Sequence, residues 1–368
     1  MNLQSEANPV AVIRSEAWAS TCAHEMERLG ITNPLVVSSR GTAERTGLSE
    51  IFSETAIFDE VLPNPTIQSC QQVIDASRLS EFDGVIAIGG GSVMDTAKCA
   101  LAALGTGSDK LSELLAWGEP FSRIVPSIFI PTTHGTASEV TMWGTIWDLE
   151  AMGKLSLSHP ALYPSVAVLD GSLCLSLPID ISLTTALDAL SHSFEALWNR
   201  HATSQSTQFA VAAICQIVER APTLKENPDR LGVRQSLLEA ATMAGLAFSQ
   251  TTTAAAHSIS YPLTLHYNVP HGIAASMSLM PLLDINGSAI KEPIGQIMHN
   301  LDLSAVADLK FLIAAIPEGY LKYRLRDWGI RRADIPMLAE HAFTKGRIEN
   351  NIITLSTGDI EQILESIY

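Results

Sequence analysis

The first half of the chain alternates short apolar runs with segments of helical periodicity, and this alternation limits the possible folds more than any other feature. Continuous apolar runs are typical of strands that are buried on both faces. We expect such strands at residues 34–37, 84–88, 124–130 and 166–170. We expect helices at residues 15–29, 68–79 and 92–104. Strands that alternate with helices predict βαβ units and a parallel sheet.

The second half of the chain has a different pattern. After Pro178, apolar residues recur at helical spacing and no clear strand follows. Helices are expected at residues 183–198, 204–220, 234–248 and 359–368. The sequence therefore predicts an α/β domain over residues 1–178 and an all-helical domain over residues 179–368.

Composition excludes several classes of protein. The chain has 23 Lys and Arg residues against 39 Asp and Glu, and the resulting net charge of −16 repels nucleic acid and anionic lipid. The five cysteines include no CxxC pair, so we expect neither a disulfide framework nor a thiolate metal site. No secretory signal and no apolar stretch of about 20 residues is evident, which predicts a cytoplasmic protein without a membrane span.

A glycine-rich turn follows the second expected strand. Gly89, Gly90 and Gly91 precede Ser92 and a helical segment. Glycine lets the backbone approach a pyrophosphate, and a helix N-terminus offers free N–H groups. The turn is neither a GxGxxG fingerprint nor a Walker loop, but its place between a strand and a helix favours a phosphate site. The alternative is a tight turn that binds no ligand.

A second polar segment, residues 131–141, follows the third expected strand. It carries Thr132, Thr133 and Ser138. Clustered hydroxyl groups at a strand end are suited to bind the ribose, adenine or phosphate of a nucleotide. The alternative is a local network of turn and helix-capping hydrogen bonds.

Asp188 and His192 are four residues apart in an expected helix, so their side chains lie on one face about one turn apart. His257 and His271 follow in a later apolar segment. One carboxylate and three imidazoles suit Fe(II) or Zn(II) better than Mg²⁺ or Ca²⁺. For the Asp188–His192 pair alone, the alternative is an ion pair on a helix surface.

Together these motifs resemble the iron-containing (group III) alcohol dehydrogenase family. The resemblance rests on the following strings, which span most of the chain: Pro63-Asn64-Pro65-Thr66, residues 89–98, Pro131-Thr132-Thr133, Gly135-Thr136, residues 138–141, residues 188–192 with Glu195, His257, and Pro270-His271-Gly272. It implies an N-terminal dinucleotide-binding α/β domain and a C-terminal all-helical domain, with a metal and a nicotinamide cofactor between them.

The resemblance also implies roles for individual residues. The implied metal ligands are Asp188, His192, His257 and His271. Pyrophosphate contacts fall to Gly90, Gly91 and Ser92, and Asp95 would lie on the nicotinamide side. The remaining residues implied to line the cofactor site are Asn64, Thr132, Thr133, Ser138, Lys154 and Leu177, although Lys154 could also be an ordinary solvated lysine.

Two positions depart from the family pattern. His134 stands where a small residue is common before Gly135. Many members have a histidine four residues after the third metal ligand, whereas this chain has Tyr261. A tyrosine hydroxyl could replace that histidine as the proton donor.

The implied reaction is hydride transfer between a nicotinamide and the carbon of a carbonyl group that a metal polarises, with His271 and Tyr261 next to the reacting atoms. Two alternatives belong to other classes of protein. A dehydroquinate-synthase-like lyase shares the architecture but would be expected to bring more Lys and Arg and a glutamate as first ligand. A non-catalytic binding protein does not need an intact set of four ligands.

Two finer expectations concern the cofactor and the substrate. The strand at 35–37 is followed by Ser39 and Arg40 instead of the acid that selects NADH, which favours NADPH, although Arg40 could be a solvated loop residue.

The strings around Glu139, Trp143, Trp147 and Trp198 resemble the branch that reduces phosphonoacetaldehyde to 2-hydroxyethylphosphonate. Sulfoacetaldehyde, lactaldehyde and simple aldehydes are the alternatives. A small anionic aldehyde would need donors, for which His134, Trp143, Arg200 and Tyr261 are candidates. Arg200 could equally be a cation that complements a helix C-terminus. We also expect a homodimer.

Overall fold

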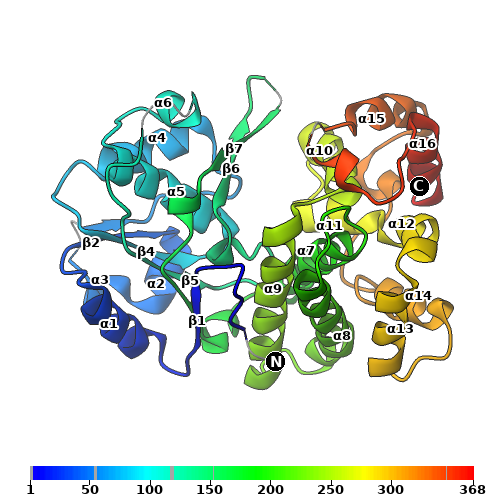
Figure 1. Ribbon diagram of the computed structural model, residues 1–368, viewed down its shortest axis with the longest axis horizontal. Coiled ribbons are helices and arrows are strands. Elements are labelled where there is room, and N and C mark those ends of the chain that lie inside the picture. The colour runs from blue at the N-terminus through cyan, green and yellow to red at the C-terminus, as the bar shows by residue number, and fades with distance from the viewer. Residues whose placement is uncertain (1–2, 54–55, 117–119, 152, 345) are drawn as a thin grey trace. The chain divides into compact units, whose positions relative to one another are not determined.

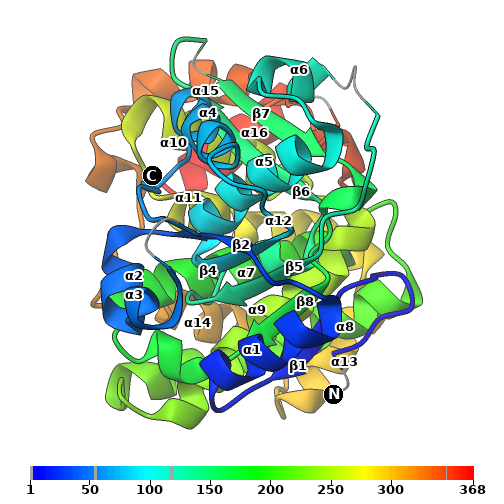
Figure 2. The same cartoon turned by 90° about the vertical axis from the view of Figure 1, so that its left-hand side faces the viewer.

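The computed structural model describes residues 3–53, 56–116, 120–151, 153–344 and 346–368. Its chain divides into two compact units. One unit comprises the chain up to Thr133 together with Ala137–Cys174, and the other comprises His134–Thr136 together with Leu175–Tyr368. Figures 1 and 2 show the two units from two sides.

The first unit is built around a six-stranded parallel sheet with the order β1-β8-β5-β4-β2-β3. Its strands are β1 (Ala11–Arg14), β2 (Pro34–Ser38), β3 (Ile57–Phe58), β4 (Gly84–Gly89), β5 (Ser127–Pro131) and β8 (Val166–Leu169). Its helices are α1 (Trp18–Leu29), α2 (Arg40–Thr46), α3 (Leu48–Ile51), α4 (Ile67–Ala76), α5 (Gly91–Thr106) and α6 (Leu111–Ala116). The parallel sheet and its intervening helices are therefore confirmed.

Alternate residues of the same strands enter two separate cores. Val85 and Ala87 of β4 pack with residues of α4 and α5, whereas Ile86 and Ile88 pack with residues of α1 and α3. Because side chains alternate between the faces of a strand, both faces of the sheet are covered by helices (Figure 2). This explains why the central strands read as unbroken apolar runs.

A two-stranded antiparallel hairpin, β6 (Trp143–Asp148) and β7 (Gly153–Ser158), lies outside the main sheet. This hairpin, β1 and β3 were not expected from the sequence. It packs against α5: a Cβ atom on Gly144 would lie 3.0 Å from the Asp95 carbonyl oxygen. The hairpin therefore lies beside the helix that the glycine-rich turn begins.

In the part that the structure describes, the second unit contains helices and connecting loops but no strand, as expected. Its helices are α7 (Ile179–Leu197), α8 (Ser204–Glu226), α9 (Leu231–Thr251), α10 (Ala255–Tyr267), α11 (His271–Met277), α12 (Leu279–Asn286), α13 (Lys291–Asn300), α14 (Val306–Ala315), α15 (Ile335–His341) and α16 (Thr357–Ser366). Helices α7, α8 and α9 pack on one another, and α11 packs on α7 and α10 (Figure 1).

Among the described residues, no single helix is long and apolar enough to cross a membrane. One pair, His271–Ala289 and Lys291–Asn300, meets the length and composition criteria jointly, but it is bent by 116°.

Candidate metal centre and nucleotide-binding turn

Helices α7 and α10 bring together three buried side chains that could hold one metal ion. Asp188 and His192 are one turn apart on α7, as their spacing predicts, and His257 is in the first turn of α10. One ligand atom from each of the three lies within 4.8 Å of the others. All three side chains are buried, so the cluster is built into the core of the helical unit.

His271 joins this cluster as the first residue of α11. Its Nε2 lies 3.8 Å from Asp188 Oδ1, and the Nε2 of His257 lies 3.5 Å from the same oxygen. Ligand atoms that share a tetrahedral ion at about 2.1 Å are about 3.4 Å apart. The His271 side chain is 25% exposed, whereas the other three are almost fully buried. His271 is thus the most accessible of the four predicted ligands.

The rings around the cluster are held by stacking. The His192 ring stacks on Phe248 with centroids 4.1 Å apart, and on His257 with centroids 4.4 Å apart. Such offset contacts restrict the rotation of each ring. The imidazoles are therefore oriented by the core before any ion arrives.

The electrostatics of the cluster favour a cation. Burial disfavours the charged form of Asp188, but the neighbouring His192, His257 and His271 hold its pKa well below the usual value. Burial likewise opposes a charge on His257, but the carboxylates of Glu195 and Asp188 raise its pKa.

Asp188 Oδ1 and His257 Nε2 are both buried and have no hydrogen-bond partner among the described residues. A divalent cation would bind both of these atoms, and the proton of His257 would be released when it does. The four residues therefore fit a borderline metal such as Fe(II) or Zn(II).

Tyr261 lies one helical turn after His257 on α10. Its ring is nearly parallel to that of His271, at an interplanar angle of 8° and a centroid distance of 6.3 Å. The side chain is 6% exposed. The structure thus places the expected proton donor beside the metal cluster.

In the other unit, the glycine-rich turn joins β4 to α5 in extended backbone. Gly90 is at the N-cap of α5, and a Cβ atom there would lie 3.0 Å from Cγ2 of Thr133. The Ser92 hydroxyl accepts the backbone N–H of Asn64 at 3.1 Å. The turn therefore brings Gly90, Gly91, Ser92, Asn64 and Thr133 together at one helix N-terminus, as a phosphate site requires.

Asp95 is buried beneath this turn with both carboxylate oxygens engaged. One oxygen accepts the Ser138 hydroxyl at 2.7 Å, and the other accepts the Thr145 N–H at 3.0 Å. Burial raises its pKa, against the opposing charges of Lys98 and Lys154. Asp95 therefore connects α5 to the segment after β5 and to the β6–β7 hairpin.

Lys98 completes this buried network. Its Nζ is within hydrogen-bond distance of the Ser138 carbonyl and hydroxyl oxygens, the Thr141 hydroxyl and the Trp143 carbonyl, at 2.7–2.9 Å. The side chain is fully buried, and burial lowers its pKa to about 8. Lys98 thus fixes the polar segment that carries Ser138 onto α5.

The other residues expected near the cofactor lie in both units. Thr132 is buried after β5 and donates its N–H to the Gly89 carbonyl at 3.0 Å. Ser39 is at the N-cap of α2, where its hydroxyl donates to Thr42, and Arg40 is exposed as the first residue of that helix. Leu177 belongs to the helical unit, where its carbonyl accepts from Arg234.

One side chain expected to bind a substrate anion is engaged elsewhere. The Arg200 guanidinium donates to the Asn351 carbonyl at 2.8 Å and to the Thr354 hydroxyl at 2.7 Å. It follows the end of α7, and nine residues of helix between Asp188 and Leu197 span about 13 Å. The structure therefore does not bring Arg200 to the metal cluster.

His134 is fully buried in the helical unit, where its N–H donates to the Thr185 hydroxyl at 3.2 Å. Burial and the charge of Arg234 lower its pKa to about 3. The imidazole is therefore neutral at ordinary pH and offers no cation to an anion. Trp143 is half-buried at the start of β6.

Two residues near these sites received no role in the sequence analysis. Glu195, seven residues after Asp188, lies on the same face of α7 and contacts His257. Lys98, three residues after Asp95, lies on the same face of α5. Helical spacing places each of them beside a predicted site residue, and this was the available signal.

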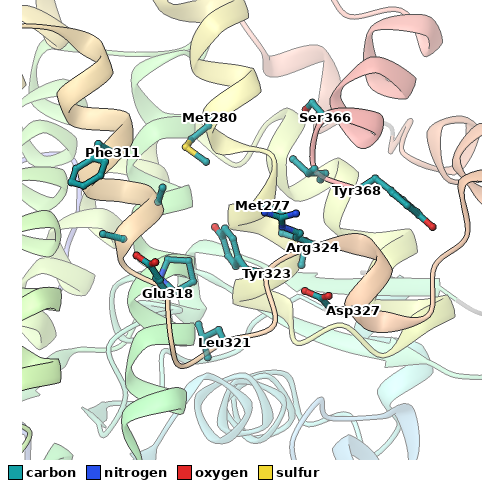
Figure 3. Close-up of a pocket in the computed structure, with 14 residues that line it drawn as sticks. Met277, Met280, Phe311, Glu318, Leu321, Tyr323, Arg324, Asp327, Ser366 and Tyr368 are labelled. Carbon is teal, nitrogen blue, oxygen red and sulfur yellow. The ribbon is translucent and has the colours of Figure 1, made fainter.

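A cavity of about 640 Å³ in the helical unit is separate from these residues. Met277, Met280 and Tyr323 line it together with Phe311, which is exposed at the surface (Figure 3). It contains none of the predicted site residues, and Met277 is at the opposite end of α11 from His271.

Comparison with known proteins identifies the family. A sequence model described as "Iron-containing alcohol dehydrogenase" matches residues 9–171, and one described as "Fe-containing alcohol dehydrogenase family, C-terminal" matches residues 182–368. The NAD-dependent methanol dehydrogenase of Bacillus methanolicus is 28% identical over 363 residues, which are 93% of each chain. The phosphonoacetaldehyde reductase of Streptomyces viridochromogenes is 36% identical over 215 residues, which are 57% of this chain and 54% of the relative.

Among solved structures, sulfoacetaldehyde reductase from Bifidobacterium kashiwanohense in complex with NAD⁺ superposes with a TM-score of 0.89. It is 25% identical, and the match covers 100% of this chain and 99% of the other. The two matched sequence models cover nearly the whole chain, and a cluster of metal-ligand type lies in the part that the second one matches. The chain therefore belongs to the iron-containing alcohol dehydrogenase family and is an oxidoreductase that acts on alcohols or aldehydes.

Proposed function

We propose that this dehydrogenase reduces a two-carbon aldehyde carrying a phosphonate or sulfonate group to the corresponding primary alcohol. Phosphonoacetaldehyde is the first candidate, because the relative with that named activity shares 36% of its residues over the matched segment. Sulfoacetaldehyde is the second, because the whole fold matches a sulfoacetaldehyde reductase. Both are short anionic aldehydes.

In the proposed site, Asp188, His192, His257 and His271 hold a divalent metal, Fe(II) or Zn(II). When bound, this metal supplies a Lewis acid that polarises the substrate carbonyl. The stacked His192 and His257 rings keep two of the ligands in one orientation. The buried surroundings of Asp188 exclude water from that side of the cluster.

Tyr261 is the proposed proton donor. Its ring lies parallel to that of the accessible ligand His271, and it is one helical turn after His257 on α10. A neutral phenol is protonated at ordinary pH and can donate to a developing alkoxide. Tyr261→Phe should therefore lower kcat and leave the bound metal unchanged.

The α/β unit would bind the nicotinamide nucleotide, which supplies the hydride when bound. Gly90, Gly91 and Ser92 present the N–H groups of α5 to the pyrophosphate. The remaining proposed contacts are Asn64, Thr132, Thr133, Ser138, Lys154 and Leu177. Asp95 has both oxygens engaged, so its proposed role is to hold Ser138 in place.

We further propose that NADPH is preferred to NADH. β2 ends without a carboxylate that would repel a 2′-phosphate, and the exposed Arg40 stands at the start of α2. A charge-assisted hydrogen bond of about 1.5–3 kcal/mol corresponds to roughly 10-fold or more in affinity. Arg40→Ala should lower kcat/KM for NADPH by about that factor and leave NADH unaffected. A clear preference of the wild-type enzyme for NADH would refute this choice.

A homodimer is proposed because β1 is an edge strand. Within the described residues it pairs with β8 on one side, and on its other edge the Val12 carbonyl accepts the Gln4 side chain but no strand is paired, so a second copy could add a strand there. Light scattering after gel filtration would decide between a monomer and a dimer.

A panel of aldehydes tests the substrate. The metal-loaded enzyme is assayed for NADPH oxidation with phosphonoacetaldehyde, sulfoacetaldehyde, lactaldehyde and propanal at equal concentrations. The proposal predicts the highest kcat/KM for the two anionic substrates. Equal kcat/KM for propanal would overturn the substrate class and leave the family unchanged. Tyr261 and Trp143 remain the candidate donors to the anion, since the Arg200 guanidinium is engaged elsewhere and the buried His134 ring carries no charge.

A further inference from the structure

Glu195 is a fully buried carboxylate on α7 that the proposed reaction does not yet use. It lies three residues after His192 and seven after Asp188, so all three side chains share one face of the helix. A carboxylate with no exposed surface is costly unless hydrogen-bond donors satisfy its oxygens. The groups that donate to the two Glu195 oxygens therefore indicate the role of this residue.

Both oxygens of Glu195 are engaged with one residue, His257. Oε1 accepts the backbone N–H of His257 at 3.0 Å, and Oε2 is hydrogen-bonded to the ring Nδ1. A carboxylate is only an acceptor, so the hydrogen in the second bond belongs to Nδ1. In the neutral ring the lone pair is then on Nε2, which is the nitrogen that lies 3.5 Å from Asp188 Oδ1.

The same carboxylate also stabilises the start of α10. Ala254 is the N-cap residue of this helix and has no polar side chain for capping, and His257 is the third residue of its first turn. A negative charge at a helix N-terminus is favourable, and the Glu195 carboxylate also accepts a backbone N–H of the first turn that has no partner within the helix. Glu195 thus supplies from α7 the cap that the sequence before α10 lacks.

The backbone before α10 is constrained in its turn. Thr252 has a φ of 61°, which is unusual for a β-branched residue. Its carbonyl accepts from Asn199 at 3.2 Å, and its hydroxyl accepts from Asn350 at 2.9 Å. The turn and Glu195 together fix where the His257 ring can lie.

We infer that Glu195 is a positioning residue that holds His257 as the Nδ1–H tautomer with Nε2 directed at the metal. This inference rests on the proposed metal site and not on the proposed substrate. Outer carboxylates that orient a metal-binding histidine change metal affinity by about 10–100-fold. The contribution of Glu195 should lie in that range.

The test compares Glu195→Gln with the wild type and with Ser193→Ala. Ser193 is buried on the same helix and its hydroxyl donates to the Ala189 carbonyl, so its loss perturbs α7 without touching His257. Zn²⁺ affinity of the metal-free proteins is measured by chelator competition, and melting temperature is recorded for each. The Gln amide oxygen can still accept from Nδ1. Its NH₂ group then faces the backbone N–H of His257, which is also a donor, so one of the two hydrogen bonds is lost.

We expect Glu195→Gln to weaken Zn²⁺ binding by about 10–100-fold and Ser193→Ala to leave it unchanged. Lower melting temperature with unchanged Zn²⁺ affinity in Glu195→Gln would show a merely structural role and overturn the inference.

A second readout does not depend on metal. Nitrogen-15 NMR of the metal-free wild type at a pH where the imidazole is neutral should show His257 as the Nδ1–H tautomer, with loss of that preference in Glu195→Gln. An Nε2–H tautomer in the wild type would also overturn the inference. If the wild type shows the expected tautomer but binds no Zn²⁺, the metal site of the proposed function fails while the contact from Glu195 stands.

Discussion

Gly272 packs so closely on Thr184 that a Cβ atom at position 272 would lie 2.1 Å from the Thr184 carbonyl oxygen and 3.1 Å from Cβ of Asp188. The contact sets the distance between α11, which begins with His271, and α7, which carries Asp188. The close approach needs a residue without a side chain, and the glycine after His271 provides it.

Gly272→Ala should therefore push α11 away from α7 and separate His271 from Asp188. We expect a loss of stability of about 1–3 kcal/mol, as for other overpacked cores, and a clear loss of bound metal. Denaturant unfolding and elemental analysis measure the two effects. Gly295→Ala is the matched control, because no atom lies within 4 Å of its added Cβ. Gly295 lies inside α13, so that change should stabilise by about 0.5–1 kcal/mol.

His271→Ala should remove metal without unfolding the chain. The residue begins a short helix and is partly exposed, so little packing is lost. His271 would bind the metal directly, so metal affinity and turnover should both fall by more than the roughly 10–100-fold expected for the loss of Glu195, which only orients a ligand. Elemental analysis and circular dichroism give the two readouts. His266→Ala, at an exposed histidine near the end of α10, should change neither, and full activity in His271→Ala would disprove the metal site.

Lys98→Met should strongly destabilise the α/β unit. It removes the positive charge that opposes the buried Asp95 carboxylate, and it removes the ammonium group that donates to the Ser138 and Trp143 carbonyls. Breaking a buried charge pair costs about 3–5 kcal/mol.

Adding Asp95→Asn should recover part of the loss, since the uncompensated charge is then gone. Lys110→Met removes an exposed ion pair with Glu113 and should change the free energy of unfolding by less than about 1 kcal/mol. A similarly small effect of Lys98→Met in urea unfolding would contradict the structural role given to Lys98.

His134 should make stability depend on pH. Its folded-state pKa is about 3, below the ordinary value of 6.5, so only the unfolded chain takes up this proton as pH falls through 6.5. The stability that the neutral ring contributes is complete above pH 6.5 and declines toward pH 3, with a slope of up to about 1.4 kcal/mol per pH unit.

His134→Phe should remove that part of the slope, as measured by the free energy of unfolding at several pH values between 4 and 7. His24→Phe, at an exposed histidine of α1, is the control and should keep the slope of the wild type. An unchanged slope in His134→Phe would show that this ring titrates normally.

The central strands of the sheet could be predicted because burial on both faces leaves a continuous apolar run, as at Val85–Ile88. The β6–β7 hairpin could not, because β7 mixes Lys154 and Ser156 with Leu155 and Leu157, and it packs on α5 instead of joining the sheet. Its existence depends on contacts with distant residues.

The metal cluster likewise contains residues whose proximity could be predicted from the sequence and residues whose proximity could not. The i, i+4 spacing of Asp188 and His192 predicts their proximity, since one helix carries both. His257 and His271 lie more than 60 residues further along, and their approach depends on how α10 and α11 pack on α7. The sequence pointed to them through the family resemblance. Arg200 was expected near a substrate, but α7 ends before it, and its guanidinium binds the segment at Asn351.

The division of the chain into units bears on how such enzymes could exchange parts. His134–Thr136 belongs to the helical unit although the residues on both sides belong to the other one. Gly135 packs against Thr185, with room for no Cβ atom. The N-terminal family match, residues 9–171, nevertheless includes this tripeptide. A chimaera joined between the two family matches would therefore carry a foreign tripeptide into the helical half, so recombination at that junction succeeds only when the tripeptide and α7 come from compatible parents.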